Sequence, residues 1–224
     1  MLLVLPELLD AKALKTVDGI LSKSTFVEGE TTAGEEAKLV KRNLQLDRDR
    51  PNKVEKIDEM ISSALWANPA FRTAVIPLRI KTPMYAKYTE GMNYGVHSDN
   101  PIMGGPEVMR SDLSVTLFLA EPDTYEGGEL TVRTDNGEAR IKLPKGDAVV
   151  YPTGALHAVQ PVTKGERVVA VTWIQSVIAD PHRRKIAGEI DLICQSLSKK
   201  LPQSDELNLL TAAYGNLVRL WGKV

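Results

Sequence analysis

The amino-acid sequence predicts a mainly β fold with flanking helices, built as a sandwich or barrel, of which the jelly roll is one example. From about residue 76 to residue 178, short β-type runs alternate with turn residues. On both sides of this segment, apolar residues recur at helical spacing. We therefore expect a β-domain with N-terminal helices over residues 1–178 and a C-terminal helical appendage over residues 179–224.

Two helices are expected before the β-region. The first follows Pro6, because proline is favoured in the first turn of a helix, and its apolar pattern continues to Leu21. The second covers Val54 to Leu65 and ends near Asn68-Pro69. The polar segment between them has no clear assignment, and its run from Lys41 to Leu46 is typical of solvated surface.

Several short strands with tight turns are expected in the β-region. In the run Leu113 to Leu119, apolar residues alternate with mostly polar ones, which indicates a strand with one well-buried face. Asp135-Asn136-Gly137 is a strong hairpin turn. Further strands are expected at Glu129–Val132, Ala139–Leu143, Ala148–Tyr151, Leu156–Val162 and Arg167–Ile174.

The stretch from Asp180 to Val224 returns to helical spacing. Its two apolar stripes consist of Ile186, Ile190, Ile193 and Leu197, and of Leu209, Leu210, Ala213, Leu217, Leu220 and Trp221. We expect these helices to pack on the β-core, and exposed apolar stripes on them could support a homodimer.

Composition places the chain among ordinary soluble globular proteins. Hydrophobic residues make up 43%, charged residues 25%, and the formal net charge is −1. A near-neutral chain without a basic block gives no electrostatic reason to bind nucleic acid or an anionic membrane. We therefore expect neither as a partner.

The remaining global features favour a cytoplasmic protein. Cys194 is the single cysteine, so an intrachain disulfide is impossible. The apolar start at Met1 to Pro6 is brief, lacks a basic lead-in and is a poor signal peptide. No apolar stretch approaches the ~20 residues that a membrane helix needs.

Two histidines and one aspartate form a candidate metal site. His97 and Asp99 are two positions apart, so on a strand their side chains would point to the same face. A fold that brings His157 alongside completes the two-histidine, one-carboxylate set of non-heme Fe(II) oxygenases. His-x-Asp alone is a weak signal, but these are two of only three histidines in the chain. The third, His182, follows a proline at a helix start and is expected to be a surface or capping residue.

Two neighbouring features bear on this site. The strand before His97 is rich in glycine and tyrosine, as where a backbone must approach a ligand closely. Arg167 lies at the head of an otherwise apolar strand, where it shares a face with Val169, Val171 and Trp173. Arg167 either reaches solvent at the strand end or binds a carboxylate at the bottom of a pocket.

At this point the sequence resembles a known family. The run from Met84 to Pro101 is similar to the signature of the PKHD-type hydroxylases, relatives of the prolyl 4-hydroxylases in the Fe(II)/2-oxoglutarate dioxygenase superfamily. The similarity extends over nearly the whole chain, including the C-terminal helices. Its further motifs are Thr32–Gly34, Lys41–Leu46, Tyr125–Leu130, Tyr151–His157, Pro161–Arg167 and Trp173–Ser176.

The resemblance implies a fold, a cofactor set and an activity. It implies a double-stranded β-helix in which His97, Asp99 and His157 hold iron and Arg167 binds the distal carboxylate of 2-oxoglutarate. The implied reaction consumes 2-oxoglutarate and O2, releases succinate and CO2, and hydroxylates an unactivated C–H bond, with ascorbate as a candidate reductant. Relatives act on prolyl residues in proteins or on small molecules, so the substrate stays open.

Some positions depart from relatives or remain ambiguous. Gly215 stands where the family usually has a histidine, and Leu117 stands near a tyrosine that binds cosubstrate in certain prolyl hydroxylases. Tyr88 and Tyr94 resemble tyrosines that line the cosubstrate pocket, although they could equally fill a barrel interior.

Two other functions are compatible with a jelly roll. One is a binding module whose triad holds zinc or nothing, and the other is an iron dioxygenase that does not use 2-oxoglutarate. Substrate choice is expected to reside in two loops, Lys38 to Asn52 and Pro101 to Ser111, the second of which could be a lid.

Overall fold

The computed structural model describes residues 1–29, 40–50, 53–104 and 108–223 of the chain. The motif Thr32–Gly34 lies outside these residues, as do parts of the two predicted substrate loops. The described parts of those loops hold short strands rather than irregular chain. The first contains β3 (Lys41–Arg42) and β4 (Leu44–Leu46), and the second contains the paired strands β8 (Ile102–Met103) and β9 (Met109–Arg110).

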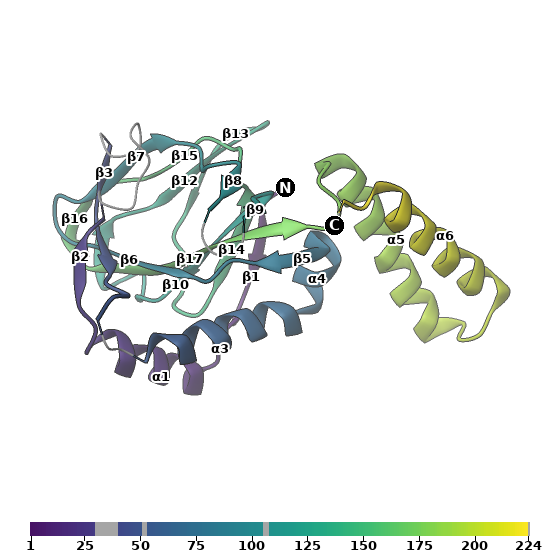
Figure 1. Cartoon of the computed structure of the whole chain (residues 1–224), viewed down its shortest axis with the longest axis horizontal. Coiled ribbons are helices and arrows are strands. Elements are labelled where there is room, and N and C mark those ends of the chain that lie inside the picture. The colour runs from purple at the N-terminus through teal and green to yellow at the C-terminus, as the bar shows by residue number, and fades with distance from the viewer. Residues whose placement is uncertain (30–39, 51–52, 105–107, 224) are drawn as a thin grey trace.

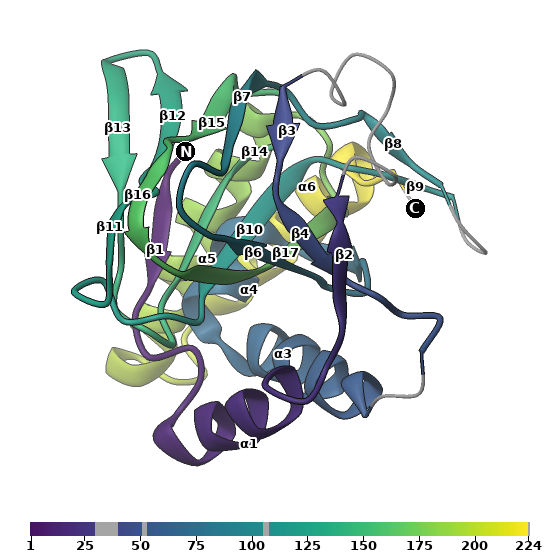
Figure 2. The ribbon, with the colours of Figure 1, turned by 90° about the vertical axis from the view of Figure 1, so that its left-hand side faces the viewer.

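Two antiparallel sheets form the body of the molecule, which confirms the mainly β prediction (Figures 1 and 2). The larger sheet has the order β1 (Leu3–Leu5), β14 (Ala148–Pro152), β10 (Leu113–Phe118), β17 (Arg167–Ser176), β6 (Met84–Tyr88), β4 and β2 (Phe26–Glu28), with β5 (Pro77–Ile80) also paired to β17. The smaller sheet has the order β13 (Gly137–Ile141), β12 (Leu130–Thr134), β15 (His157–Val159), β7 (Asn93–His97) and β3.

The strand expected at Leu156–Val162 is two strands. β15 ends at Val159, and the chain resumes pairing at β16 (Val162–Gly165), whose partner is β11 (Tyr125–Gly127). Pro161 lies in the break, where a residue without a backbone N–H cannot continue a ladder.

Three helices cover the outer face of the larger sheet (Figure 1): α1 (Ala11–Leu21), α3 (Val54–Ala67) and α4 (Pro69–Val75). The prediction that the first helix follows Pro6 is wrong. The preceding chain is strand β1, Glu7 then takes a left-handed conformation (φ 48°), and the helix begins after Asp10, whose side chain accepts a hydrogen bond from the Ala13 backbone N–H.

Strand β10 is buried on both faces, whereas the sequence indicated one buried face. Its leucines and valine, including Leu117, face the helices and join the core between helices and sheet. The alternate residues Ser114, Thr116 and Phe118 face the space between the two sheets. Polar side chains on a doubly buried strand need partners, and the site between the sheets contains them.

The C-terminal helices do not pack on the β-core as predicted. Helix α5 (Pro181–Lys200) packs against α4 and against α6 (Asp205–Trp221), and Figure 1 shows the pair projecting from one end of the sheets. Gly188 allows the close approach to α4, because a Cβ there would lie 2.8 Å from the Thr73 carbonyl oxygen. His182 is exposed in the first turn of α5, and Asp180 is the residue that caps it.

Candidate active site

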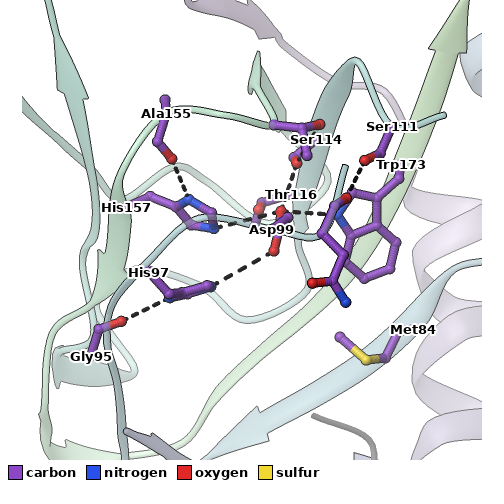
Figure 3. A network of polar contacts seen from close by, with 12 residues as sticks. Met84, Gly95, His97, Asp99, Ser111, Ser114, Thr116, Ala155, His157 and Trp173 are labelled. Carbon is purple, nitrogen blue, oxygen red and sulfur yellow. Dashed lines mark hydrogen bonds and ion pairs between the residues drawn. The ribbon is translucent and has the colours of Figure 1, made fainter. Parts of the chain in front are cut away.

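The predicted metal ligands converge between the two sheets. His97 ends β7 and pairs directly with His157 at the start of β15. Asp99 lies two residues beyond the end of β7 rather than on the strand. Its carboxylate oxygens lie 3.7 Å from Nε2 of His97 and 3.7 Å from Nε2 of His157 (Figure 3). Three potential ligand atoms therefore face one point.

Both imidazoles are oriented in the same way. Nδ1 of His97 lies 2.8 Å from the Gly95 carbonyl oxygen, and Nδ1 of His157 lies 2.8 Å from the Ala155 carbonyl oxygen. A carbonyl oxygen accepts only, so Nδ1 carries the proton in each ring and Nε2 presents its lone pair toward Asp99 (Figure 3). Backbone hydrogen bonds of this kind fix the tautomer of metal-binding histidines.

The charge state of His97 suits metal binding. Burial, together with the neighbouring His157, lowers the pKa of His97 to about 4. The ring is therefore neutral at neutral pH, the state in which Nε2 can act as a ligand.

A β-bulge explains how two side chains of β7 reach the same place. Tyr94 pairs with Val159 and His97 with His157, so β7 has one more residue than β15 in this interval. Tyr94 consequently stacks on the His97 ring, with 3.6 Å between centroids. The prediction that a glycine here lets the backbone approach a ligand is wrong for Gly95, because a Cβ there would lie 2.8 Å from the Val40 side chain.

Arg167 is the most unusual side chain in the cavity. It is 1% exposed, which excludes the solvent-directed alternative, and its buried Nε and Nη1 atoms have no hydrogen-bond partner among the residues that the structure describes. Its guanidinium lies over the rings of Tyr88 (5.1 Å) and Phe118 (5.6 Å). Burial lowers the pKa of this guanidinium, because the charged form loses its solvation inside the protein.

Two tyrosines flank the guanidinium. Tyr88 is the direct cross-strand partner of Arg167, and its hydroxyl accepts a hydrogen bond from Asn43 Nδ2 at 3.0 Å. Its own hydroxyl hydrogen is therefore available for another acceptor. Across the described ranges the buried hydroxyl of Tyr125 has no hydrogen-bond partner, and the nearby guanidinium opposes the rise that burial causes in its pKa.

These side chains line a cavity of about 510 Å³. Val169, Val171 and Trp173 line it together with Arg167, as the strand pattern predicted. Leu117 faces away from it, and the hydroxyl-bearing residues in that region are Thr116 and Tyr151, whose oxygens lie 3.4 Å apart.

Several cavity residues were not identified from the sequence. Lys41 and Asn43, assigned to solvated surface, are 3% and 1% exposed and line the cavity. Burial lowers the pKa of Lys41 to about 8. The alternation of polar and apolar residues from Asn43 to Leu46 was the available signal for a strand with an inward polar face. Ser114 and Trp173, which both bind Asp99, were also missed as site residues.

Comparisons with known proteins agree with this geometry. The model of the 2OG-Fe(II) oxygenase superfamily matches residues 83–175, a span that contains His97, Asp99, His157 and Arg167. The chain is 43% identical to a PKHD-type hydroxylase of Rippkaea orientalis over 224 residues, covering 100% of both chains. It is 42% identical to another of Picosynechococcus sp. over 219 residues, covering 98% of both.

Solved structures support the jelly-roll fold at low sequence identity. A prolyl hydroxylase from Trichoplax adhaerens in complex with a hypoxia inducible factor fragment has a TM-score of 0.59 at 14% identity, with 83% of this chain and 86% of that chain covered. A prolyl-4-hydroxylase from Pseudomonas putida has a TM-score of 0.53 at 16% identity, with 78% and 92% covered. HygX from Streptomyces hygroscopicus, solved with nickel, 2-oxoglutarate and hygromycin B, has a TM-score of 0.55 at 12% identity, with 78% and 82% covered.

Proposed function

This chain belongs to the PKHD-type hydroxylases of the 2OG-Fe(II) oxygenase superfamily, and from that premise we propose the ligands of its iron and 2-oxoglutarate and the class of its substrate. It is an Fe(II)- and 2-oxoglutarate-dependent dioxygenase. We assign the iron to His97, Asp99 and His157, and the distal carboxylate of 2-oxoglutarate to Arg167. The substrate is an unactivated C–H bond of a prolyl residue in a protein.

One observation carries the assignment of the site. A pre-oriented set of two imidazoles and a carboxylate shares a cavity with a buried guanidinium, two of whose nitrogen atoms have no hydrogen-bond partner in the described part of the chain. The donor set suits ferrous iron and leaves coordination positions open. The unpaired guanidinium suits a carboxylate, which arginine binds with two parallel hydrogen bonds. A keto-diacid is a ligand that can use both ends at once.

In this scheme the residues that line the cavity have separate roles. Arg167 and the free hydroxyl hydrogen of Tyr88 bind the distal carboxylate, and Tyr125 adds a hydroxyl beside the guanidinium. Tyr94 stays a predicted cosubstrate residue, and its stacking on His97 supports a role in holding that ring. When bound, iron would supply the activation of O2 coupled to oxidative decarboxylation of 2-oxoglutarate, with one oxygen atom ending in succinate and the other in the hydroxylated product.

The alternatives are disfavoured by the same facts. A pure binding module has no use for a separate carboxylate anchor beside vacant metal positions. An iron dioxygenase without 2-oxoglutarate leaves the buried charge of Arg167 unexplained. Membership in the family argues against both.

A prolyl residue in a protein is the substrate class that the surroundings of the cavity favour over a small molecule. Val96 lines the cavity and is 65% exposed, and Ile102 on the adjoining ribbon β8 is 53% exposed. Exposed apolar side chains beside a site mark a surface that a larger partner can cover. Incubation with peptide libraries, followed by mass spectrometry for the gain of one oxygen atom, tests this choice.

Three further predictions accompany the proposal. Ascorbate as reductant and the cytoplasm as location both stay predictions. No helix in the described part of the chain is long and apolar enough to cross a membrane.

A homodimer is supported by Leu209 and Leu220 on α6, which are 72% and 74% exposed. A loss of the dimer in the Leu209→Glu variant, measured by light scattering, would support that interface.

The direct test of the proposed function is turnover. The purified protein with Fe(II), O2 and 2-oxoglutarate should form succinate, slowly without substrate and faster with it. A chelator should stop the reaction, and Fe(II) should restore it. Oxygen uptake that is independent of 2-oxoglutarate would overturn the proposal.

A further inference from the structure

The two oxygen atoms of the Asp99 carboxylate have different surroundings. Oδ2 accepts a hydrogen bond from Ser114 Oγ at 2.8 Å and another from Trp173 Nε1 at 2.9 Å (Figure 3). Within the described part of the chain, Oδ1 accepts no hydrogen bond and lies 3.7 Å from Nε2 of His97, while Oδ2 lies 3.7 Å from Nε2 of His157. A carboxylate oxygen has about two lone-pair positions, so the two donors occupy those of Oδ2.

The fold places both donors with precision. Ser114 on β10 and Trp173 on β17 are direct partners in the register of the larger sheet, so their side chains leave the same face side by side. Ser114 is fully buried, and its hydroxyl oxygen lies 3.1 Å from the hydroxyl of Thr153. Ser114 can also donate to Thr153 Oγ1, but the charged carboxylate at 2.8 Å is the stronger acceptor for its single hydrogen.

We propose that Trp173 and Ser114 are positioning residues that keep Asp99 a one-oxygen ligand of the iron. With Oδ2 held by two donors, Oδ1 is the oxygen that remains for the metal. This inference rests on the proposed function, which requires three free positions of the six around iron, two for 2-oxoglutarate and one for O2. A carboxylate that bound through both oxygens would take one of these three.

The proposal also explains a choice of residue that packing alone does not. Trp173 is only partly buried, and it lines the cavity opposite Met84. Any large apolar side chain could fill that wall. An indole adds one N–H, a donor without acceptor capacity, and here that donor is directed at the non-ligating oxygen of Asp99.

The test compares variants that each remove one hydrogen-bond donor to Asp99 with matched control variants. Trp173→Phe removes the indole donor, and Ser114→Ala removes the hydroxyl donor. Trp66→Phe on the exposed side of α3 and Ser196→Ala on the exposed side of α5 make the same changes far from Asp99. Ser114→Thr keeps a hydroxyl and serves as the conservative rescue. Thermal melts establish that each variant is folded.

Two measurements that do not depend on turnover are made on each variant. The first is Fe(II) affinity by anaerobic titration, and the second is the visible spectrum of the Co(II)-substituted protein, which reports the number and geometry of ligands. We expect Trp173→Phe and Ser114→Ala each to weaken Fe(II) binding, by roughly 10- to 100-fold, as loss of an outer hydrogen bond to a ligand does. The Co(II) spectrum and the affinity for 2-oxoglutarate should change with it, whereas both controls and Ser114→Thr should match the wild type.

The outcomes separate this inference from the proposed function. If both variants bind Fe(II) like the wild type and give an unchanged Co(II) spectrum, the positioning role is wrong while the iron site stands. If the wild-type protein itself fails to bind Fe(II), the proposed function and this inference fall together. Changed spectra in the two variants, with unchanged spectra in the two controls, support the inference.

Discussion

The two ends of the active-site cavity differ in how their polar groups are satisfied. At the metal end, the outer atoms of His97, His157 and Asp99 all have hydrogen-bond partners in the protein. At the anion end, Nε and Nη1 of Arg167 and the hydroxyl of Tyr125 are buried and have no such partner within the part of the chain that the structure describes. The protein therefore completes one end itself and leaves the other end for a ligand to complete.

This difference has an energetic consequence. A buried cation without a partner costs several kcal/mol of folding free energy, while hydrogen-bonded ligands cost little. The anion end therefore lowers the unfolding free energy of the ligand-free protein, and a bound carboxylate should raise it again. At the metal end, hydrogen bonds within the protein already hold the side chains of His97, His157 and Asp99, and the following experiments challenge this contrast.

The largest effect is expected at the metal end. Asp99→Ala removes the single charged ligand and should reduce 2-oxoglutarate decarboxylation by at least about a thousandfold, the scale seen when one member of a catalytic unit is lost. Retained Fe(II) content and turnover in this variant would remove Asp99 from the site. Asp205→Ala at the exposed start of α6 is the control and should leave turnover unchanged.

Changes at Arg167 should separate the two ends. Arg167→Lys should weaken 2-oxoglutarate binding by about 100-fold with Fe(II) affinity nearly intact, because an ammonium cannot form the paired hydrogen bonds of a guanidinium. An unchanged affinity for 2-oxoglutarate would refute the anchor. Isothermal titration in the presence of Fe(II), without oxygen, measures both.

Arg167→Met tests the stability argument. Replacing an unpaired buried charge with an apolar side chain of similar length should raise the unfolding free energy of the ligand-free protein by about 1–4 kcal/mol. Denaturant unfolding of the two proteins measures the difference. A variant less stable than the wild type would show that Arg167 is already compensated without ligand.

The same contrast predicts which protein a ligand stabilises. With metal present, 2-oxoglutarate at a hundred times its Kd should add about 2.7 kcal/mol to the wild type. For a chain of this size, each kcal/mol of added stability raises Tm by roughly 2–4 °C. Arg167→Met should gain little at the same concentration, and equal gains in both proteins would contradict the assignment.

The smallest effect is a pH dependence at the metal end. His97 has a pKa of about 4 in the folded protein, below its unfolded value of about 6.5. As pH falls through that window, the unfolded chain takes up a proton that the folded chain refuses, so the unfolding free energy should fall by at most about 1.4 kcal/mol per pH unit. Denaturant unfolding at a series of pH values measures this loss, and the metal-free wild type should lose more unfolding free energy than His97→Asn as the pH falls. Parallel plots of unfolding free energy against pH for the two proteins would contradict the prediction.

The proposed metal ligands were predictable because each lies in a short sequence pattern. His-x-Asp, a second histidine after a tight turn and an arginine at the head of an apolar strand each leave a readable pattern, and the structure brings their side chains together. The groups around them were not readable in this way. Trp173 and Ser114 meet at Asp99 only through the strand register, and the bulge that brings Tyr94 onto His97 depends on pairing with β15.

Errors elsewhere have the same origin. Lys41 and Asn43 are polar residues in a polar segment, and their burial depends on contacts inside the cavity. There Lys41 lies over the ring of Tyr94, and Asn43 donates a hydrogen bond to Tyr88. The C-terminal stripes were taken to face the β-core because apolar helix faces usually do. Here one face of α5 is used for α4 and another for α6, while Leu209 and Leu220 remain exposed.

The central claim, that iron and 2-oxoglutarate meet between His97, Asp99, His157 and Arg167, is tested most directly by anaerobic titration. Fe(II) followed by 2-oxoglutarate should give the weak visible charge-transfer band of a chelated keto acid in the wild-type protein. Asp99→Ala should show no band, and Arg167→Lys should show it only at higher 2-oxoglutarate concentration. A wild-type protein that binds both components without this band, or an Asp99→Ala variant that retains it, would contradict the account.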